Sequence, residues 1–382
     1  MRLAYKVSVF LNIILLKVVK KVVSILLKYG VPIVISLGLA YFFYANVDID
    51  AIGKSIREDV NWWWFIPVIV VSIFSHVFRA LRWRLQLRAI GIEAPLSAIV
   101  NSIFGTYFVN LLVPRLGEVW RSGYISNREK APFTKVLGSM VGDRLSDTVT
   151  VLLLTVVTFF LAQDAFMKFL SQRNAGGNQE SMFATWWFWL LVVCGIAGVA
   201  LLVWLYRTKS QNKAVQKLQG IVRNLWEGFY AITKMKGKWW FLLYTILIWG
   251  CYFMQLYLAS FAFNCTKDLG VIAILVLFVL SSIGMAVPSN GGMGPWQYAI
   301  MFGLAIYGVG SLPLTNPYNP EASAFAWVVW GIQTILLIVL GIYAFIYMEI
   351  DRRRIAAGKV SILTPDSNDK TNQTTDKQEQ QI

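Results

Sequence analysis

The sequence has little charge and few of the residues on which soluble enzymes depend. Only 14% of the 382 residues are charged, about half the fraction typical of a soluble globular protein. The single histidine, His76, makes a histidine-based metal site or catalytic triad hard to build. The three cysteines (Cys194, Cys251 and Cys265) lie far apart in apolar runs, without metal-like or redox-like spacing. We therefore expect no catalytic residue, no metal site and no cofactor.

Long uncharged segments are what the sequence has instead, since 57% of its residues are hydrophobic. A helix needs about 20 such residues to cross the hydrocarbon of a bilayer, and several segments reach that length. The fold class predicted is therefore all-α, a polytopic membrane helix bundle. We expect about eight spans, at 31–47, 61–80, 134–162, 184–206, 239–262, two within 269–320, and 322–348.

The net charge of +15 is unevenly distributed along the chain. Twenty-seven Lys and Arg residues lie in five connecting segments (2–28, 79–88, 115–135, 207–238 and 352–359), against 5 in the other three (48–59, 164–180 and 267). Cytoplasmic loops carry such an excess of basic residues. We predict an integral protein of the bacterial inner membrane with both termini in the cytoplasm. Membrane orientation accounts for the charge, so we expect no nucleic-acid partner.

Three regions are expected along the chain. Residues 1–29 are predicted to form a basic amphipathic helix on the inner leaflet, and 210–236 a second interfacial helix. Residues 30–350 form the transmembrane domain. Residues 351–382, whose end is rich in Gln, Asn, Asp and Thr, are predicted to be a disordered cytoplasmic tail.

The uncharged run from Ala94 to Pro114 conflicts with a simple crossing. Both of its flanks, 79–88 and 115–135, carry cytoplasmic-type charge, and a single crossing would place one of them outside. The run also contains polar residues, including Asn101 and Asn110, that are unusual in a lipid-facing span. We therefore predict a re-entrant element that enters the membrane and returns.

A similar interruption occurs in the second half of the chain. Residues 269–320 hold no charge, and "VPSNGGMGPW" breaks them, so they form either two spans or a second re-entrant element plus a span. "NLLVPRLGEVW" and "GMAVPSNGGMGPW" both run apolar, Val-Pro, Gly, Trp, which is compatible with an inverted repeat or with chance. The predicted structural breaks are Pro114, Gly117, Pro288, Gly291, Gly292 and Gly294.

Arginines near the inner surface are the first candidates for binding a substrate, because a guanidinium grips phosphate in a bidentate way. In "HVFRALRWRLQLR" we select Arg82; the alternative is a membrane anchor. Arg115, Glu118 and Arg121 are spaced to share one helix face. They could hold an anion at a helix start, or only pair with one another.

The stretch "GDRLSD" places two carboxylates and a cation on one predicted span. If Lys135 marks the membrane surface, Asp143 lies about 12 Å and Asp147 about 18 Å into the membrane. Ionisable groups at that depth are costly and face the interior of a bundle. Asp143, Arg144 and Asp147 are therefore candidate substrate-binding or transport residues.

The chain resembles a known family at these motifs. "FRALRWRLQLRAIG", "NLLVPRLGEVWR", "GDRLSD" and "VPSNGGMGPW" occur in the same order as in the flippase-like transmembrane domain of lysylphosphatidylglycerol synthases, over roughly 30–350. The resemblance implies a bundle with re-entrant elements and movement of an aminoacylated phospholipid between leaflets. Two positions depart from the family pattern: Asp143 stands where Glu is usual, and Gln297 where a Glu is often found. We expect a stand-alone member without the aminoacyl-transferase domain, so the resemblance does not imply synthesis of lysyl-lipid.

Three functions are compatible with the sequence. The first is a lipid flippase or transporter that moves a phosphate-bearing lipid, with or without an aminoacyl group, between leaflets. The second is a membrane enzyme acting on a polyprenyl-phosphate-type substrate, with a divalent cation held by Asp143 and Asp147. The third is an assembly partner without transport. The expected partner is a membrane lipid, with a second copy of the chain or a lipid-synthesis enzyme as further partners.

Overall fold

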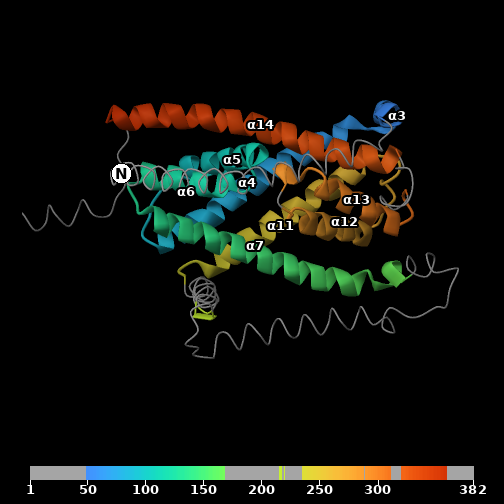
Figure 1. The fold of residues 1–382 in the computed structure, drawn as a ribbon, viewed down its shortest axis with the longest axis horizontal. Coiled ribbons are helices and arrows are strands. Elements are labelled where there is room, and N and C mark those ends of the chain that lie inside the picture. The colour runs from blue at the N-terminus through green and yellow to red at the C-terminus, as the bar shows by residue number, and fades with distance from the viewer. Residues whose placement is uncertain are drawn as a thin grey trace, which may run out of the picture.

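The computed structural model describes residues 49–167, 215–216, 219, 235–287, 289–310 and 320–358, and its named elements are all helical. Figure 1 shows these helices running roughly along one axis. They are α3 (Ile49–Asp59), η2 (Trp62–Trp64), α4 (Phe65–Ala89), α5 (Leu96–Leu112), α6 (Leu116–Arg128), α7 (Phe133–Leu161), α11 (Lys238–Ser260), α12 (Val271–Gly284), η3 (Asn290–Gly292), α13 (Pro295–Ile306) and α14 (Pro320–Ala356).

Four helices are long and apolar enough to cross a membrane. They are η2 with α4 (Trp62–Ala89), α7, α11 and α14, and all four correspond to predicted spans. Large apolar side chains such as Leu153 on α7 and Ile335 on α14 are more than 60% exposed, as lipid-facing residues are. The prediction of an all-α, polytopic membrane protein is therefore confirmed.

Several predicted elements lie outside the described residues. These are the spans at 31–47 and 184–206, the interfacial helix within 1–29, nearly all of that at 210–236, the break at Pro288, and the tail beyond 358. The helix α14 continues to Ala356, past the predicted domain boundary at 351.

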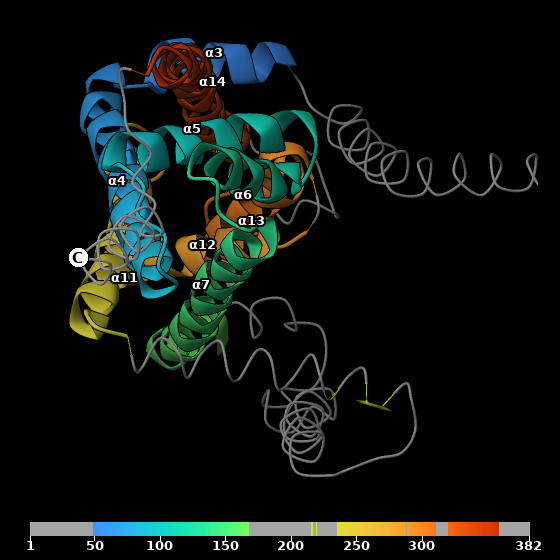
Figure 2. The same cartoon turned by 90° about the vertical axis from the view of Figure 1, so that its left-hand side faces the viewer.

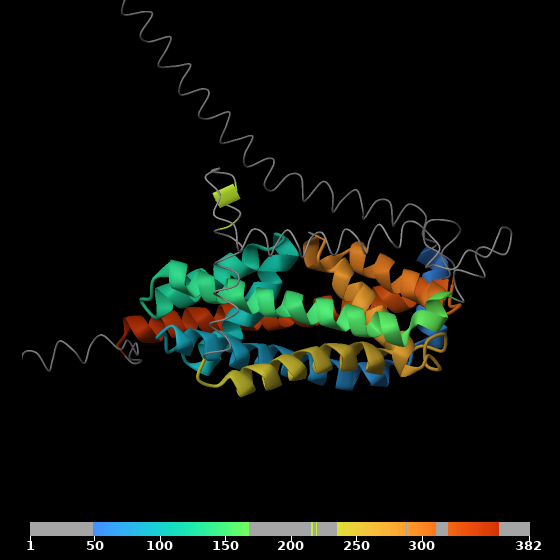
Figure 3. The ribbon, with the colours of Figure 1, turned by 90° about the horizontal axis from the view of Figure 1, so that it is seen from below.

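The two interrupted segments form two short helical hairpins. Helices α5 and α6, of 17 and 13 residues, make the first hairpin, and α12 and α13, of 14 and 12 residues, make the second. At 1.5 Å per residue the shorter helices measure roughly 18 to 21 Å, less than the hydrocarbon thickness of about 30 Å. Figure 3 shows the hairpins arranged end to end along the bundle.

The long helices surround these hairpins. Helix α14 packs on α5 and α13, and α7 packs on α6 and α12, so each of them contacts both hairpins. Helices α4 and α11 pack together on the other side, where α4 contacts α5 and α7 (Figure 2).

The break between α5 and α6 follows from Pro114. A residue before proline is pushed out of the helical region, and Val113 is extended, with φ −137° and ψ 117°. Arg115 then adopts a left-handed conformation with φ 61°, and α6 begins at Leu116. The Asn110 side chain accepts a hydrogen bond from the Gly117 amide at 2.8 Å, which satisfies one free N–H of the first turn.

The break between α12 and α13 depends on glycine. Gly294 has φ 90° and ψ −72°, a conformation that L-residues rarely adopt, and Pro295 directly after it starts α13. The Gln297 side chain accepts a hydrogen bond from the Gly294 amide at 2.8 Å. Gln297 thus caps its own helix, although its Nε2 has no partner among the described residues.

The two breaks meet in space. The guanidinium of Arg115 donates a hydrogen bond to the carbonyl of Ala286 at 2.7 Å. A Cβ added at Gly291 would lie 2.4 Å from the Leu111 side chain. Trp330 of α14 donates a hydrogen bond from its indole to the Gly291 carbonyl at 2.9 Å. The two similar stretches "NLLVPRLGEVW" and "GMAVPSNGGMGPW" therefore correspond to two hairpin tips in contact.

An ion-pair group fixes α6 to the end of α14. Arg128 donates to both carboxylate oxygens of Asp351, at 2.7 and 3.2 Å, and also pairs with Glu129. Tyr124 donates to Asp351 at 3.4 Å. Burial raises the pKa of Glu129, so its carboxylate is costly to ionise beside that of Asp351.

Replacing Asp351 with Asn is expected to loosen this attachment. It leaves the buried Arg128 with Glu129 as its remaining charged partner, and we expect a loss of about 1–3 kcal/mol in the free energy of unfolding. Thermal unfolding of the detergent-purified protein measures the change. Glu349→Gln, which breaks an exposed pair on the same helix, is the control. Equal stability of the two variants would show that the pair between Arg128 and Asp351 does not fix α6 to α14.

Candidate functional site: a buried charge cluster

One face of α4 is polar along most of its length. Residues 72, 76, 79, 82 and 86 are spaced three or four apart, so they share a stripe, and Ser75 lies beside it; all six are buried. In a membrane span the polar face turns toward the bundle interior, because lipid cannot satisfy it. The stripe therefore places Arg79 and Arg82 inside the protein, facing α7 and α11.

Arg82 is paired with both aspartates of α7. Its Nη2 lies 2.7 Å from an oxygen of Asp143 and 2.7 Å from an oxygen of Asp147. Its Nε donates to Asp143 at 3.0 Å, and its Nη1 donates to Thr245 of α11 at 3.3 Å. The side chains of Arg82 and Asp143 are both fully buried.

Arg79, one turn before Arg82 on α4, contacts the same two carboxylates. Its Nη1 donates to Asp147 at 2.8 Å and lies 3.5 Å from Asp143. Its Nε donates to the hydroxyl of Tyr252 at 3.2 Å, and that hydroxyl lies 3.3 Å from the hydroxyl of Tyr107. The cluster thus extends to α5 and α11.

Helix α6 contributes Glu118 and Arg121, and Arg144 comes from α7. Arg121 donates from Nη2 to Asp143 at 3.3 Å, and its guanidinium stacks 4.3 Å from the Trp83 ring. Glu118 accepts a hydrogen bond from Arg144 at 2.6 Å. Arg144 also lies 3.7 Å from Asp147, so it joins the pair to the rest.

The cluster, named here the buried charge cluster, unites six of the seven predicted site residues. Its members are Arg79, Arg82, Glu118, Arg121, Asp143, Arg144 and Asp147. Arg115 is the exception, because it precedes α6 and contacts the other hairpin. The prediction that Arg115 shares a face with Glu118 and Arg121 is therefore wrong, as its left-handed conformation directs it away.

Arg79, Tyr252 and Thr245 are members or contacts that the sequence did not single out. The three- to four-residue spacing of polar residues on α4 was the available signal for Arg79. Tyr252 and Thr245 lie in an uncharged run, where nothing in the spacing distinguishes them from neighbouring residues.

The charges of the cluster do not balance. Four guanidinium groups face three carboxylates, which leaves one positive charge in excess. Arg121 also has its Nε and Nη1 buried without a hydrogen-bond partner among the described residues. The aspartate oxygens are in contact with guanidinium groups, so the arrangement favours an added anion over a divalent cation.

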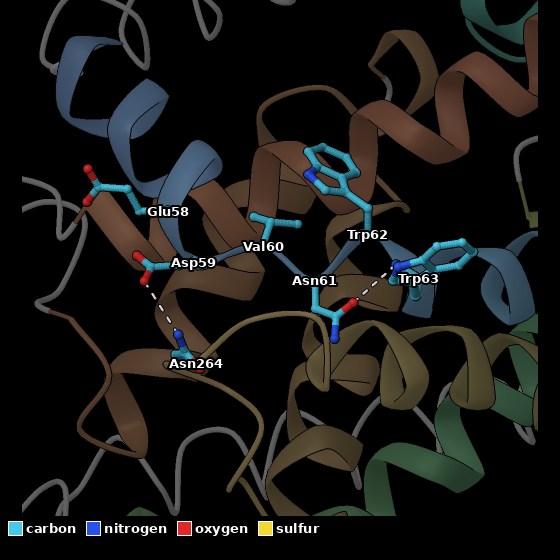
Figure 4. A pocket seen from close by; sticks show the side chains of 7 residues that line it. All are labelled: Glu58, Asp59, Val60, Asn61, Trp62, Trp63 and Asn264. Atoms are coloured by element: carbon cyan, nitrogen blue, oxygen red, sulfur yellow. Dashed lines mark hydrogen bonds between the residues drawn. The ribbon is translucent and has the colours of Figure 1, made fainter.

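An open pocket of about 460 Å³ lies elsewhere, beside α3. Figure 4 shows its lining, in which Asp59 accepts a hydrogen bond from Asn264 and the Trp63 amide donates to Asn61. None of its residues belongs to the buried charge cluster, and its tryptophans are exposed in the manner of an interfacial belt.

These features define a polytopic α-helical membrane protein that has two short helical hairpins and a buried ionic site among α4, α6 and α7. The chain belongs to the family of lysylphosphatidylglycerol synthase transmembrane regions, whose family model matches residues 30–341.

Two curated relatives are membrane proteins from archaea. The UPF0104 membrane protein PH1989 of Pyrococcus horikoshii is 22% identical over 305 residues, which cover 70% of this chain and 83% of the relative. The UPF0104 membrane protein MJ1595 of Methanocaldococcus jannaschii is 24% identical over 139 residues, covering 35% and 41%. No solved structure matches the chain.

Proposed function

We propose that the protein moves a phosphate-bearing lipid between the leaflets of the membrane, with the buried charge cluster as the site of the phosphate. The observation that carries this proposal is the excess positive charge together with the unpartnered edge of Arg121. A phosphate is the anion of a membrane lipid, and it accepts paired hydrogen bonds from a guanidinium.

The hairpins supply a route for such a movement. We propose that α5–α6 enters from the cytoplasmic side and α12–α13 from the opposite side, so that both are re-entrant and their tips meet within the membrane. Their short helices and the contact between Arg115 and Ala286 support this topology. Paired interrupted helices at a central site are typical of transporters with inverted repeats. On this topology residues 269–320 do not cross twice, and six crossings keep both termini inside.

The proposed setting is the inner membrane of a bacterium with cytoplasmic termini, as the distribution of basic residues favours. The partner is then the lipid itself, and a second copy of the chain or a lipid-synthesis enzyme are further proposed partners. An enzyme using a cation at Asp143 and Asp147 is less well supported, because guanidinium groups already contact their oxygens.

Neutralising the pair between Glu118 and Arg144 tests the proposal. Arg144 is the least buried arginine of the cluster, with a 36% exposed side chain, so Arg144→Gln and Glu118→Gln should leave folded protein. We expect each to lower lipid exposure at least tenfold in a leaflet-labelling assay of reconstituted vesicles. Arg352→Gln, which alters an exposed pair, is the control. Wild-type labelling rates in both cluster variants would contradict the assignment of the buried charge cluster as the phosphate site.

A further inference from the structure

The buried charge cluster continues into an uncharged polar group that ion pairing does not explain. We name it the neutral polar ring, and its members are Ser72, His76, Tyr107, Tyr252, Gln255 and Gln333. They come from α4, α5, α11 and α14, and Arg79 joins the ring to the charge cluster through its hydrogen bond to Tyr252.

Contacts and single helix turns close this ring. Ser72 donates to Gln333 at 2.9 Å, and Gln333 donates to Gln255 at 3.0 Å. Gln255 lies one turn from Tyr252 on α11, and His76 lies one turn from Ser72 on α4. The ring centroids of His76 and Tyr107 are 4.7 Å apart, and the two tyrosine hydroxyls are 3.3 Å apart.

Two members of the neutral polar ring, and one neighbour, have buried polar atoms without a hydrogen-bond partner in the described part of the chain. These atoms are both imidazole nitrogens of His76, the Nε2 of Gln255 and the Nε1 of the neighbouring Trp249. The His76 residue is only 4% exposed, and the Trp249 ring lies 6.0 Å from that of Tyr252. A buried polar group left unpaired costs about 1–3 kcal/mol, so a fold alone would place apolar residues here.

We infer that the neutral polar ring binds the uncharged, hydroxyl-bearing part of a lipid headgroup whose phosphate lies at the charge cluster. This inference rests on the proposed function. The unpartnered atoms of Gln255 and Trp249 are donors, and a neutral imidazole offers one donor and one acceptor. A hydroxyl, which both donates and accepts, satisfies this set.

The same set disfavours a cationic headgroup. An ammonium group only donates, and it needs several acceptors or a free carboxylate. The carboxylates of the neighbouring cluster each contact at least one guanidinium, and Arg79 adds positive charge next to the ring. The inferred substrate class is therefore an anionic lipid with a polyol headgroup, rather than the lysyl-lipid that the name of the family suggests.

The test compares three lipids with two variants. Binding of phosphatidylglycerol, phosphatidic acid and lysylphosphatidylglycerol to the purified protein is measured by native mass spectrometry, and their leaflet exchange is measured in vesicles. The variants are His76→Phe and Gln255→Leu. Met254→Leu, one residue from Gln255 but 41% exposed, is the control.

The wild type is expected to bind phosphatidylglycerol in preference to phosphatidic acid, which lacks the polyol, and to lysylphosphatidylglycerol. Each variant should lower the preference over phosphatidic acid about five- to tenfold, the equivalent of one hydrogen bond, without weakening phosphatidic acid binding. His76→Phe should also raise the melting temperature, because it removes an unpaired buried group that packs against Phe104 and Tyr107. A purely structural role predicts the opposite change in stability.

The outcomes separate this inference from the proposed function. An unchanged lipid preference in both variants, or a preference for lysylphosphatidylglycerol, overturns the neutral polar ring as a headgroup site even if exchange depends on the charge cluster. Selective, His76-dependent binding without exchange of any lipid overturns transport and leaves the headgroup site in place.

Discussion

Replacing Asp143 with Asn is expected to remove most of the folded protein. Asp143 is fully buried and contacts Arg79, Arg82 and Arg121 at 3.5, 2.7 and 3.3 Å. Its neutral amide would leave four guanidinium groups facing two carboxylates. Breaking a buried ion pair by removing one partner costs about 3–5 kcal/mol, because the remaining charge is uncompensated. Size-exclusion recovery after heating in detergent measures the loss.

A compensating change makes this prediction specific. Arg121 has Asp143 as its ion-pair partner in the cluster, so Asp143→Asn combined with Arg121→Gln restores the original charge excess. We expect the double variant to be more stable than Asp143→Asn alone. Glu349→Gln, in an exposed pair, should change stability by less than about 1 kcal/mol. A double variant no more stable than Asp143→Asn would show that charge balance is not what the cluster provides.

Adding one methyl group at Gly117 is expected to separate the helices of the first hairpin. A Cβ there would lie 2.1 Å from the Thr106 carbonyl oxygen and 2.8 Å from the Asn110 side chain. The backbone of α5 would have to move, which also removes the hydrogen bond from Asn110 to the Gly117 amide. Overpacking of this kind costs about 1–3 kcal/mol or more.

Gly123 provides a matched control on the same helix. A Cβ at Gly123 meets nothing within 4 Å, so Gly123→Ala should stabilise α6 by up to about 1 kcal/mol. In the second hairpin a Cβ at Gly284 would lie 2.7 Å from the Pro295 carbonyl oxygen. Its control is Gly250 on α11, where a Cβ meets nothing within 4 Å. We expect Gly117→Ala and Gly284→Ala to lose exchange activity and melting temperature. Equal behaviour of all four variants would contradict close hairpin packing.

The sequence predicted the elements whose cause is local. Proline and glycine at 114, 117, 291, 292 and 294 lie at the two breaks, and the long apolar runs at α4, α7, α11 and α14 are helices. The depth argument for Asp143 and Asp147 placed them in the interior, where they are buried.

The pairing between helices could not be predicted from the same signals. Arg115 and Glu118 were expected to bind an anion or each other, but the left-handed turn at Arg115 sends one to Ala286 and leaves the other to Arg144. Arg79 and Tyr252 are 173 positions apart, and only the packing of α4 on α11 brings them together. The contact between the hairpin tips is likewise tertiary, although the similar Val-Pro stretches in the two halves indicated that the two breaks are related.

The most direct test of the central claim is the lipid that remains bound to the purified protein, identified and quantified by mass spectrometry in the wild type, Arg121→Gln and Arg352→Gln. If the buried charge cluster holds a lipid phosphate, a phosphate-bearing lipid copurifies with the wild type and with Arg352→Gln, and at least tenfold less remains on folded Arg121→Gln. Equal retention by all three proteins, or a retained lipid without phosphate, would contradict the account.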